Sequence, residues 1–178
     1  DCRPGANWLA NARKYFEVEG VVGVEGIIIS DHHGDDNWRP VTNVGFESIG
    51  FMTANLMVRN SVFQYLGGFD LQFDHPHFRE DTDFGWRMQQ LGLVPYAKDV
   101  DVFHPAQLRS KERESASSRA RFFQKDVLLY RKHPEKYQEL FLQERHYVIT
   151  SGFKENLLLG FKIENEPVPQ WMAELLNA

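Results

Sequence analysis

The run over residues 21–29 limits the fold more than any other part of this sequence. It is apolar and rich in β-branched residues, a composition that favours a buried strand over a helix. Gly23 and Gly26 lie inside it, and a glycine within a strand marks a bulge or a close backbone approach. Residues 7–16 place apolar side chains at helical spacing just before the run. The sequence therefore predicts a helix packed on a sheet that contains this strand.

The remaining segments alternate between extended and helical patterns. We expect extended segments at residues 51–59, 93–96 and 100–103, and helices directly after residue 59, from Asp81 to Gly92 and over residues 115–132. Gly67-Gly68 is expected to end the first of these helices. Residues 134–178 are helical in tendency, so the chain as a whole predicts an α/β fold.

Composition excludes several classes of protein. A length of 178 residues predicts one compact unit with a real core, and 14 Phe, 6 Tyr and 4 Trp could fill that core or stack on sugars. A single cysteine excludes an internal disulfide and the multi-cysteine zinc patterns. The net charge of −5 is spread along the chain, which argues against nucleic acid as a partner. No apolar run approaches the roughly 20 residues of a membrane span.

Three carboxylates, Glu80, Asp81 and Asp83, stand at the start of one predicted helix. The aligned amides of a helix N-terminus favour negative charge, which helps a carboxylate stay ionised and accept a proton as a general base. The same residue types are also the ordinary choice for capping a first helical turn. Taken alone, this segment leaves catalysis and capping open.

A polar loop over residues 30–43 holds aspartates and two adjacent histidines, His32 and His33. Such residues can bind a divalent ion, but they are also usual in solvated turns. The histidines lack the i,i+4 spacing that would direct both at one ion, so we favour a solvated loop. Trp38, near the end of this loop, is a candidate platform for stacking a sugar ring.

Residues 50–105 carry an ordered set of motifs that resembles the inverting family 2 glycosyltransferases of the GT-A fold. The matching pieces are Ala54-Asn55-Leu56-Met57-Val58-Arg59, Leu66-Gly67-Gly68-Phe69-Asp70, Arg79-Glu80-Asp81-Thr82-Asp83-Phe84-Gly85-Trp86-Arg87, Gly92-Leu93-Val94-Pro95-Tyr96 and Val102-Phe103-His104-Pro105. Upstream, Asp1-Cys2-Arg3-Pro4 resembles the last aspartate of the family's Asp-x-Asp metal motif together with its next three residues. Downstream, His133-Pro134-Glu135 resembles the family's C-terminal region.

The resemblance implies a partial GT-A (nucleotide-diphospho-sugar transferase) fold, a mixed sheet flanked by helices. Residues 1–132 would form the acceptor-side part of the domain, and residues 133–178 a helical extension of the same unit. A nucleotide-binding half would precede residue 1, so residues 1–178 alone are expected to be inactive. The family also implies a cytoplasmic setting at the membrane periphery, with membrane association of the full-length protein.

The resemblance also implies roles for individual residues. Asp81 would be the catalytic base that deprotonates the acceptor hydroxyl, assisted by Glu80. Mg²⁺ or Mn²⁺ would bind at Asp1, with His104 as a further ligand. Acceptor-binding residues would be Asp83, Asn55, Trp86 and Phe51.

The donor implied is a nucleotide-diphospho-sugar, and the acceptor a carbohydrate or lipid-linked molecule, as in polysaccharide biosynthesis. Structural roles remain open for Asn55, Trp86 and His104, because each is also a common core or strand-end residue. A non-catalytic carbohydrate-binding module is the alternative function. Hydrolysis by paired carboxylates is disfavoured, since Glu80 and Asp81 are neighbours and do not face each other across a bond.

Overall fold

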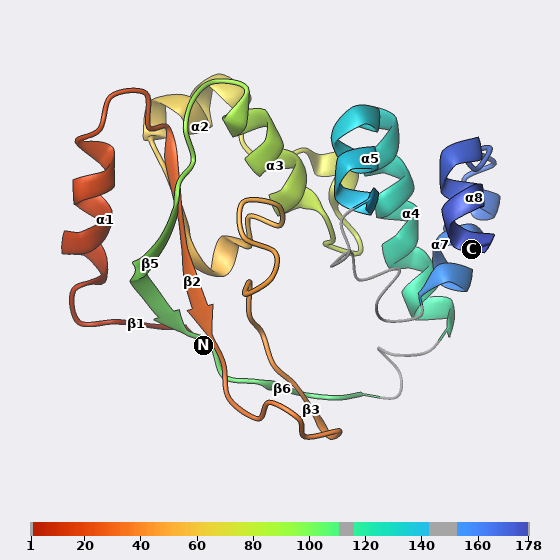
Figure 1. Cartoon of the computed structure of the whole chain (residues 1–178), viewed down its shortest axis with the longest axis horizontal. Helices are drawn as coiled ribbons and strands as arrows, with labels where there is room; N and C mark the ends of the chain where they lie inside the picture. The colour runs from red at the N-terminus through yellow and green to blue at the C-terminus, as the bar shows by residue number, and fades with distance from the viewer. Residues whose placement is uncertain (1, 111–115, 143–152, 178) are drawn as a thin grey trace. The chain divides into compact units, whose positions relative to one another are not determined.

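The computed structural model describes residues 2–110, 116–142 and 153–177, and it has a mixed α/β fold (Figure 1). The chain divides into two compact units where the length suggested one. The first unit comprises Asp1–Leu71 and Glu80–Arg109, and the second comprises Gln72–Arg79 and Ser110–Ala178. The boundary expected after residue 132 falls inside the second unit.

The first unit is built on a four-stranded mixed sheet with the order β1-β5-β2-β4. The strands are β1 (Arg3–Pro4), β2 (Gly23–Ile29), β4 (Leu56–Val58) and β5 (Tyr96–Phe103). The two inner strands, β2 and β5, are parallel, and the outer strands pair antiparallel to them. A short antiparallel ribbon of β3 (Trp38–Arg39) and β6 (Gln107–Leu108) extends beyond the carboxyl ends of the inner strands (Figure 1).

The strand expected at residues 21–29 is confirmed, and it contains the irregularity that its glycines indicated. Gly26 pairs with Ala97, but the next residue, Ile27, pairs with Asp101, so the register of β2 against β5 shifts at this point. A side chain at Gly26 would collide with the carbonyl oxygen of Val100 and with the side-chain amide of Asn55. The missing Cβ of Gly26 is therefore what lets these groups approach the strand.

Helices cover both faces of the sheet. On one face, Ala12 of α1 (Trp8–Phe16) joins a buried cluster with Val24 and Val100 of the inner strands. On the other face lies α3 (Glu80–Gln89), whose Met88 sulfur is 3.3 Å from where a Cβ on Gly23 would stand. Successive strand residues face opposite sides, so β2 presents Val24 to α1, whereas Gly23 and Glu25 face the α3 side.

The helix expected after residue 59 is α2 (Asn60–Leu66), and it ends at Gly67-Gly68 as the sequence indicated. Gly67 has a φ of 73°, and the amides of Gly67 and Gly68 donate to carbonyls in the last turn. Left-handed backbone of this kind favours glycine. The segment before α2 is a 3-10 turn, η1 (Thr53–Asn55), followed directly by β4, and this replaces most of the longer strand expected at residues 51–59.

The second unit is helical in the residues that the structure describes. Its helices are α4 (Ala116–Lys132), α5 (Pro134–Leu142), α7 (Lys154–Ile163) and α8 (Gln170–Asn177). The 3-10 turn η2 (Leu71–Phe73) begins at the last residue of the first unit's first segment and continues into the second unit. Gly160 brings α7 close to the backbone of Phe123 in α4, and the Tyr130 and Phe161 rings meet at 5.8 Å. Among the described residues, no helix combines the length and the apolar character needed to cross a bilayer.

Candidate active site on helix α3 and at the strand ends

The acid cluster lies at the start of α3, as expected, and its members occupy different environments. Glu80 and Asp81 are the first two residues of the helix and are partly exposed, whereas Asp83 is fully buried. The backbone amide of Thr82 donates to Asp81 Oδ1 over 2.8 Å, and the Thr82 hydroxyl donates to the Gly50 carbonyl. Arg79, immediately before the helix, has a φ of 72°, which turns the chain into the first turn.

Asp83 forms a structural ion pair with Arg87. Arg87 Nε donates to Asp83 Oδ2 over 2.8 Å, one helical turn further on. The same guanidinium donates to the carbonyls of Leu66 and Gly68, so it ties α3 to the turn that ends α2. Asp83 therefore holds the helix in place and, being buried, does not present its carboxylate to solvent.

Glu80 differs from Asp81 and Asp83 in its hydrogen bonding. Its Oε2 atom is buried, and no hydrogen-bond partner for it occurs among the residues that the structure describes. Leaving a buried oxygen without a donor costs about 1 to 3 kcal/mol, more when the group is charged. A ligand hydroxyl that donated to this oxygen would remove that cost.

A loop over residues 43–51 lies on the α3 side of the sheet and is fastened by a buried carboxylate. Glu25 of β2 accepts hydrogen bonds from the Ser48 amide at 2.7 Å, from the Asn43 side chain at 3.2 Å and from the Phe51 backbone. Burial raises the pKa of Glu25, although these donors partly oppose the rise. Phe51 is fully buried, and Gly85 of α3 leaves the space that its ring fills.

Two members of this loop, Ser48 and Phe51, have φ angles of 60° and 53°, which residues with a side chain rarely adopt. Strained backbone of this kind persists only where surrounding contacts enforce it. The Glu25 carboxylate supplies those contacts, because the Ser48 and Phe51 amides both donate to it. The loop conformation is thus coupled to a buried carboxyl group in the middle of the sheet.

Tyr96 on β5 stands directly opposite Glu25 in the parallel pairing. Its hydroxyl is buried and has no partner among the described residues. Burial, with the nearby charges of Glu47 and Glu25, raises the pKa of Tyr96 to about 12. Tyr96 therefore stays neutral at physiological pH.

Asn55 lies at the register shift between the inner strands and is 2% exposed. Its amide nitrogen donates to the carbonyls of Ile27 and Val100, both at 2.8 Å, and its oxygen accepts from the Trp8 indole at 2.9 Å. Those contacts link β2, β5 and α1. Both polar atoms of the Asn55 side chain are therefore used in hydrogen bonds within the fold, which is the structural role that the sequence left open.

Asp31 and His104 follow the paired carboxyl ends of β2 and β5, so the two chain segments run side by side there. The Ser30 hydroxyl donates to the His104 carbonyl at 2.8 Å, and the Ala106 amide donates to Asp31 Oδ1 at 2.7 Å. That amide is the main reason that the pKa of Asp31 lies below its usual value, with His32 and Arg3 adding smaller electrostatic contributions. We call Asp31 and His104 the strand-end pair.

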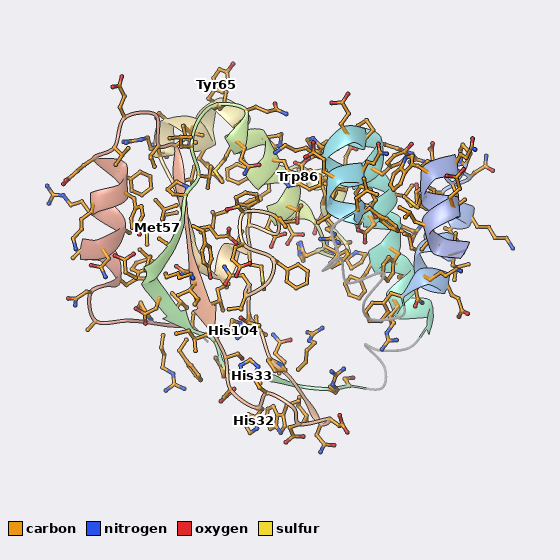
Figure 2. The ribbon with its side chains drawn as sticks, viewed as in Figure 1. His32, His33, Met57, Tyr65, Trp86 and His104 are labelled. Atoms are coloured by element: carbon orange, nitrogen blue, oxygen red, sulfur yellow. The ribbon has the colours of Figure 1, made fainter. Side chains whose placement is uncertain are left out.

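A hydrogen bond of the His104 ring determines which of its two nitrogens carries the hydrogen. Nδ1 lies 2.8 Å from the carbonyl oxygen of Pro105, and a carbonyl can only accept, so Nδ1 must carry the hydrogen. In the neutral ring, Nε2 then holds the lone pair that could bind a metal ion or accept a proton. Figure 2 shows His104 and His33 at the same end of the sheet.

The histidine loop behaves largely as a solvated turn. His33 Nε2 donates to the Ser30 carbonyl at 3.0 Å, and the His32 ring stacks on Trp38 with 4.5 Å between ring centroids. One face of Trp38 is thus already covered by an imidazole. A sugar platform on Trp38 would have to use the opposite face or displace His32.

The structure brings the predicted site residues together in three places. Asp81, Glu80, Asp83, Trp86 and Phe51 gather at the first turns of α3, with Trp86 only 3% exposed. Asn55 lies at the sheet irregularity and His104 at the strand ends, while Asp1 lies outside the described residues. Asp31 was not predicted as a site residue, because only the parallel pairing of β2 with β5 places it beside His104.

Searches of known protein families, curated proteins and solved structures find no match to this chain.

Proposed function

We propose that this chain carries the acceptor side and the general base of an inverting, GT-A type sugar transferase that uses a nucleotide-diphospho-sugar donor. The observation that carries the proposal is the difference in burial between two carboxylates on α3. Asp83 is buried with Arg87, whereas Asp81 stays partly exposed in the first helical turn. A general base needs that combination of access and a charge-stabilising setting.

Asp81 is the residue to which we assign proton removal from the acceptor hydroxyl. The Thr82 amide donates to its Oδ1 atom, and the helix N-terminus favours its negative charge. An ionised carboxylate held in this way can accept the proton while the acceptor oxygen attacks the anomeric carbon of the donor. The bond to the leaving diphosphate breaks on the opposite side, which inverts the configuration.

Glu80 has a supporting role in this proposal. Its buried Oε2 atom needs a donor, and an acceptor sugar offers several hydroxyls. A second hydroxyl donating to Glu80 would orient the acceptor relative to Asp81. Phe51, Trp86, Asp83 and Asn55 then act by shaping and holding the surrounding structure, since all four are buried.

We assign the strand-end pair as candidate ligands for a divalent ion such as Mn²⁺ or Mg²⁺ at the leaving diphosphate. Carboxylate oxygen and imidazole nitrogen are suitable ligands for Mn²⁺, and His104 has its Nε2 lone pair available when neutral. Asp1 remains a further proposed ligand. The ion would supply positive charge to the leaving diphosphate.

The experiment is sugar transfer by the intact protein that contains these residues, with a panel of nucleotide-sugars and release of nucleoside diphosphate as the readout. Asp81→Asn should lower turnover by at least about 100-fold, the lower limit for loss of a general base. Donor binding by this variant should stay within about twofold of the original protein. Asp36→Asn, on an exposed loop, is the matched control and should leave turnover unchanged.

Normal turnover by Asp81→Asn would contradict the assignment of the base. A non-catalytic carbohydrate-binding module is the second candidate, because the chain is rich in aromatic residues. It predicts glycan binding without diphosphate release from any donor, and without any effect of Mn²⁺ removal. The same panel therefore separates the two functions.

A further inference from the structure

We propose that Asp74, His75 and His77, none of which has a role in the proposed transferase site, form a binding site for Zn²⁺ or a similar transition-metal ion. One ligand atom from each residue lies within 4.8 Å of the other two. Asp74 Oδ2 is 3.1 Å from His75 Nε2, and Asp74 Oδ1 is 3.1 Å from His77 Nδ1. Three ligand atoms bound to zinc lie about 3.3 Å apart, given Zn–N and Zn–O bonds near 2.0 to 2.1 Å.

The cluster needs only small side-chain rotations to close on an ion. The His75 and His77 side chains are 88% and 71% exposed, so no neighbouring residue prevents those rotations. The Asp74 carboxylate already lies between the two rings and would supply the negative charge. Water can complete the coordination sphere, as in zinc sites with three protein ligands.

The backbone that carries these residues is anchored on both sides of the cluster within the second unit. On one side, Phe73 is fully buried, and Lys125 Nζ of α4 donates to the carbonyls of Gln72 at 2.7 Å and Asp74 at 2.8 Å. On the other side, the Phe78 ring contacts Phe122 at 5.5 Å. Arg79 Nε donates to the buried Asp126 carboxylate at 3.0 Å.

Because the chain is held at both ends, binding an ion orders only three surface side chains. That lowers the conformational entropy lost on binding, compared with three ligands on an unanchored loop. Contacts with α4 therefore hold the backbone that carries the three ligand residues.

The ligand set selects the type of ion. Two imidazole nitrogens and one carboxylate oxygen suit Zn²⁺, Co²⁺ or Ni²⁺, whereas Mg²⁺ prefers oxygen ligands. His75 would bind through Nε2 and His77 through Nδ1. This selectivity differs from that of the proposed transferase site, where Mg²⁺ or Mn²⁺ would meet a diphosphate.

The test is titration of the full chain, free of any histidine tag, with Zn²⁺ against a chromophoric chelator at pH 7.5. We expect one tightly bound equivalent, because this cluster offers three protein ligands and the strand-end pair only two, and a Zn²⁺-dependent rise in the thermal unfolding temperature. The variant H75A/H77A should bind Zn²⁺ at least about tenfold more weakly, since loss of even an outer-sphere partner costs that much. Without Zn²⁺, its unfolding temperature should equal that of the original chain, because both side chains are exposed.

Two control variants separate this site from the other histidines. H32A/H33A alters the exposed loop pair, and H104A alters the strand-end pair; both should retain the Zn²⁺ affinity of the original chain. Excess Mg²⁺ should not displace the ion. Undetectable Zn²⁺ binding by the original chain, unchanged affinity in H75A/H77A, or loss of the site in either control would overturn the proposal. None of these outcomes depends on sugar transfer.

Discussion

Replacing Asn55 tests how much of the first unit depends on one buried amide. Asn55→Ala removes the donor to two carbonyl oxygens, those of Ile27 and Val100, and the acceptor for the Trp8 indole. A buried polar group that loses its partner costs about 1 kcal/mol at the lower end of measured values. Three groups give a loss of at most about 3 kcal/mol, since the Trp8 and Ile27 contacts are only partly buried. That is a large share of a typical unfolding free energy of about 5 to 15 kcal/mol.

The assay is urea unfolding followed by circular dichroism, with Asn55→Ala compared to the original chain. Asn55→Asp keeps the side-chain shape but turns an oxygen toward two carbonyl oxygens, so it should lose at least as much stability. A double-mutant cycle with Trp8→Phe should give a coupling energy of about 1 kcal/mol for the indole hydrogen bond. Asn37→Ala, in the exposed loop, should change stability by less than about 0.5 kcal/mol.

An unfolding free energy for Asn55→Ala within about 0.5 kcal/mol of the original would refute this reasoning. If that variant instead lost acceptor binding at unchanged stability, Asn55 would be an acceptor ligand, as the family resemblance implies. The two roles thus predict opposite pairs of results.

Three other substitutions test buried charges and polar groups. Arg87→Ala should cost about 3 to 5 kcal/mol in urea unfolding, because the Asp83 carboxylate stays buried without its guanidinium partner; a loss under about 1 kcal/mol would contradict this. Tyr96→Phe should raise stability by about 1 kcal/mol, since it removes a buried hydroxyl that has no partner among the described residues, and any clear loss would indicate a missed partner. Glu25 has a raised pKa when folded, so the stability it contributes is complete below its unfolded value of 4.5 and is lost as pH rises through the higher folded value. Unfolding measured from pH 4 to pH 8 should show the original chain losing stability relative to Glu25→Gln by at most about 1.4 kcal/mol per pH unit in that window. The prediction is contradicted if the stability of the original chain relative to Glu25→Gln stays constant or increases as the pH rises.

Local patterns predicted the elements whose signals lie within one short segment. The helix at α1, the apolar strand at β2 and the stop at Gly67-Gly68 all depend on neighbouring residues, and all three are confirmed. The expected pair of extended segments at residues 93–96 and 100–103 corresponds largely to one strand, β5. The interruption between them is real, because pairing with β2 stops at Ala97 and resumes at Asp101.

Features that depend on distant residues were beyond reach of these patterns. The β3–β6 ribbon joins two-residue strands about 70 positions apart, too short for any periodicity. The strand-end pair requires knowing that β2 and β5 are parallel neighbours. At the acid cluster, residue types showed where the carboxylates lie, but burial alone distinguishes Asp83 from Asp81.

The anchored segment over residues 72–79 has a consequence for anyone trimming this chain. It belongs to the helical second unit but is encoded between two parts of the first, so no single cut separates the units. A truncation after Arg109 would keep Phe73 and Arg79 while deleting Lys125 and Asp126, which hold their segment. The Phe73 ring, buried in the intact chain, would then be exposed and would make a shortened protein prone to aggregate. Excising residues 72–79 as well would require a new linker from Leu71 to Glu80.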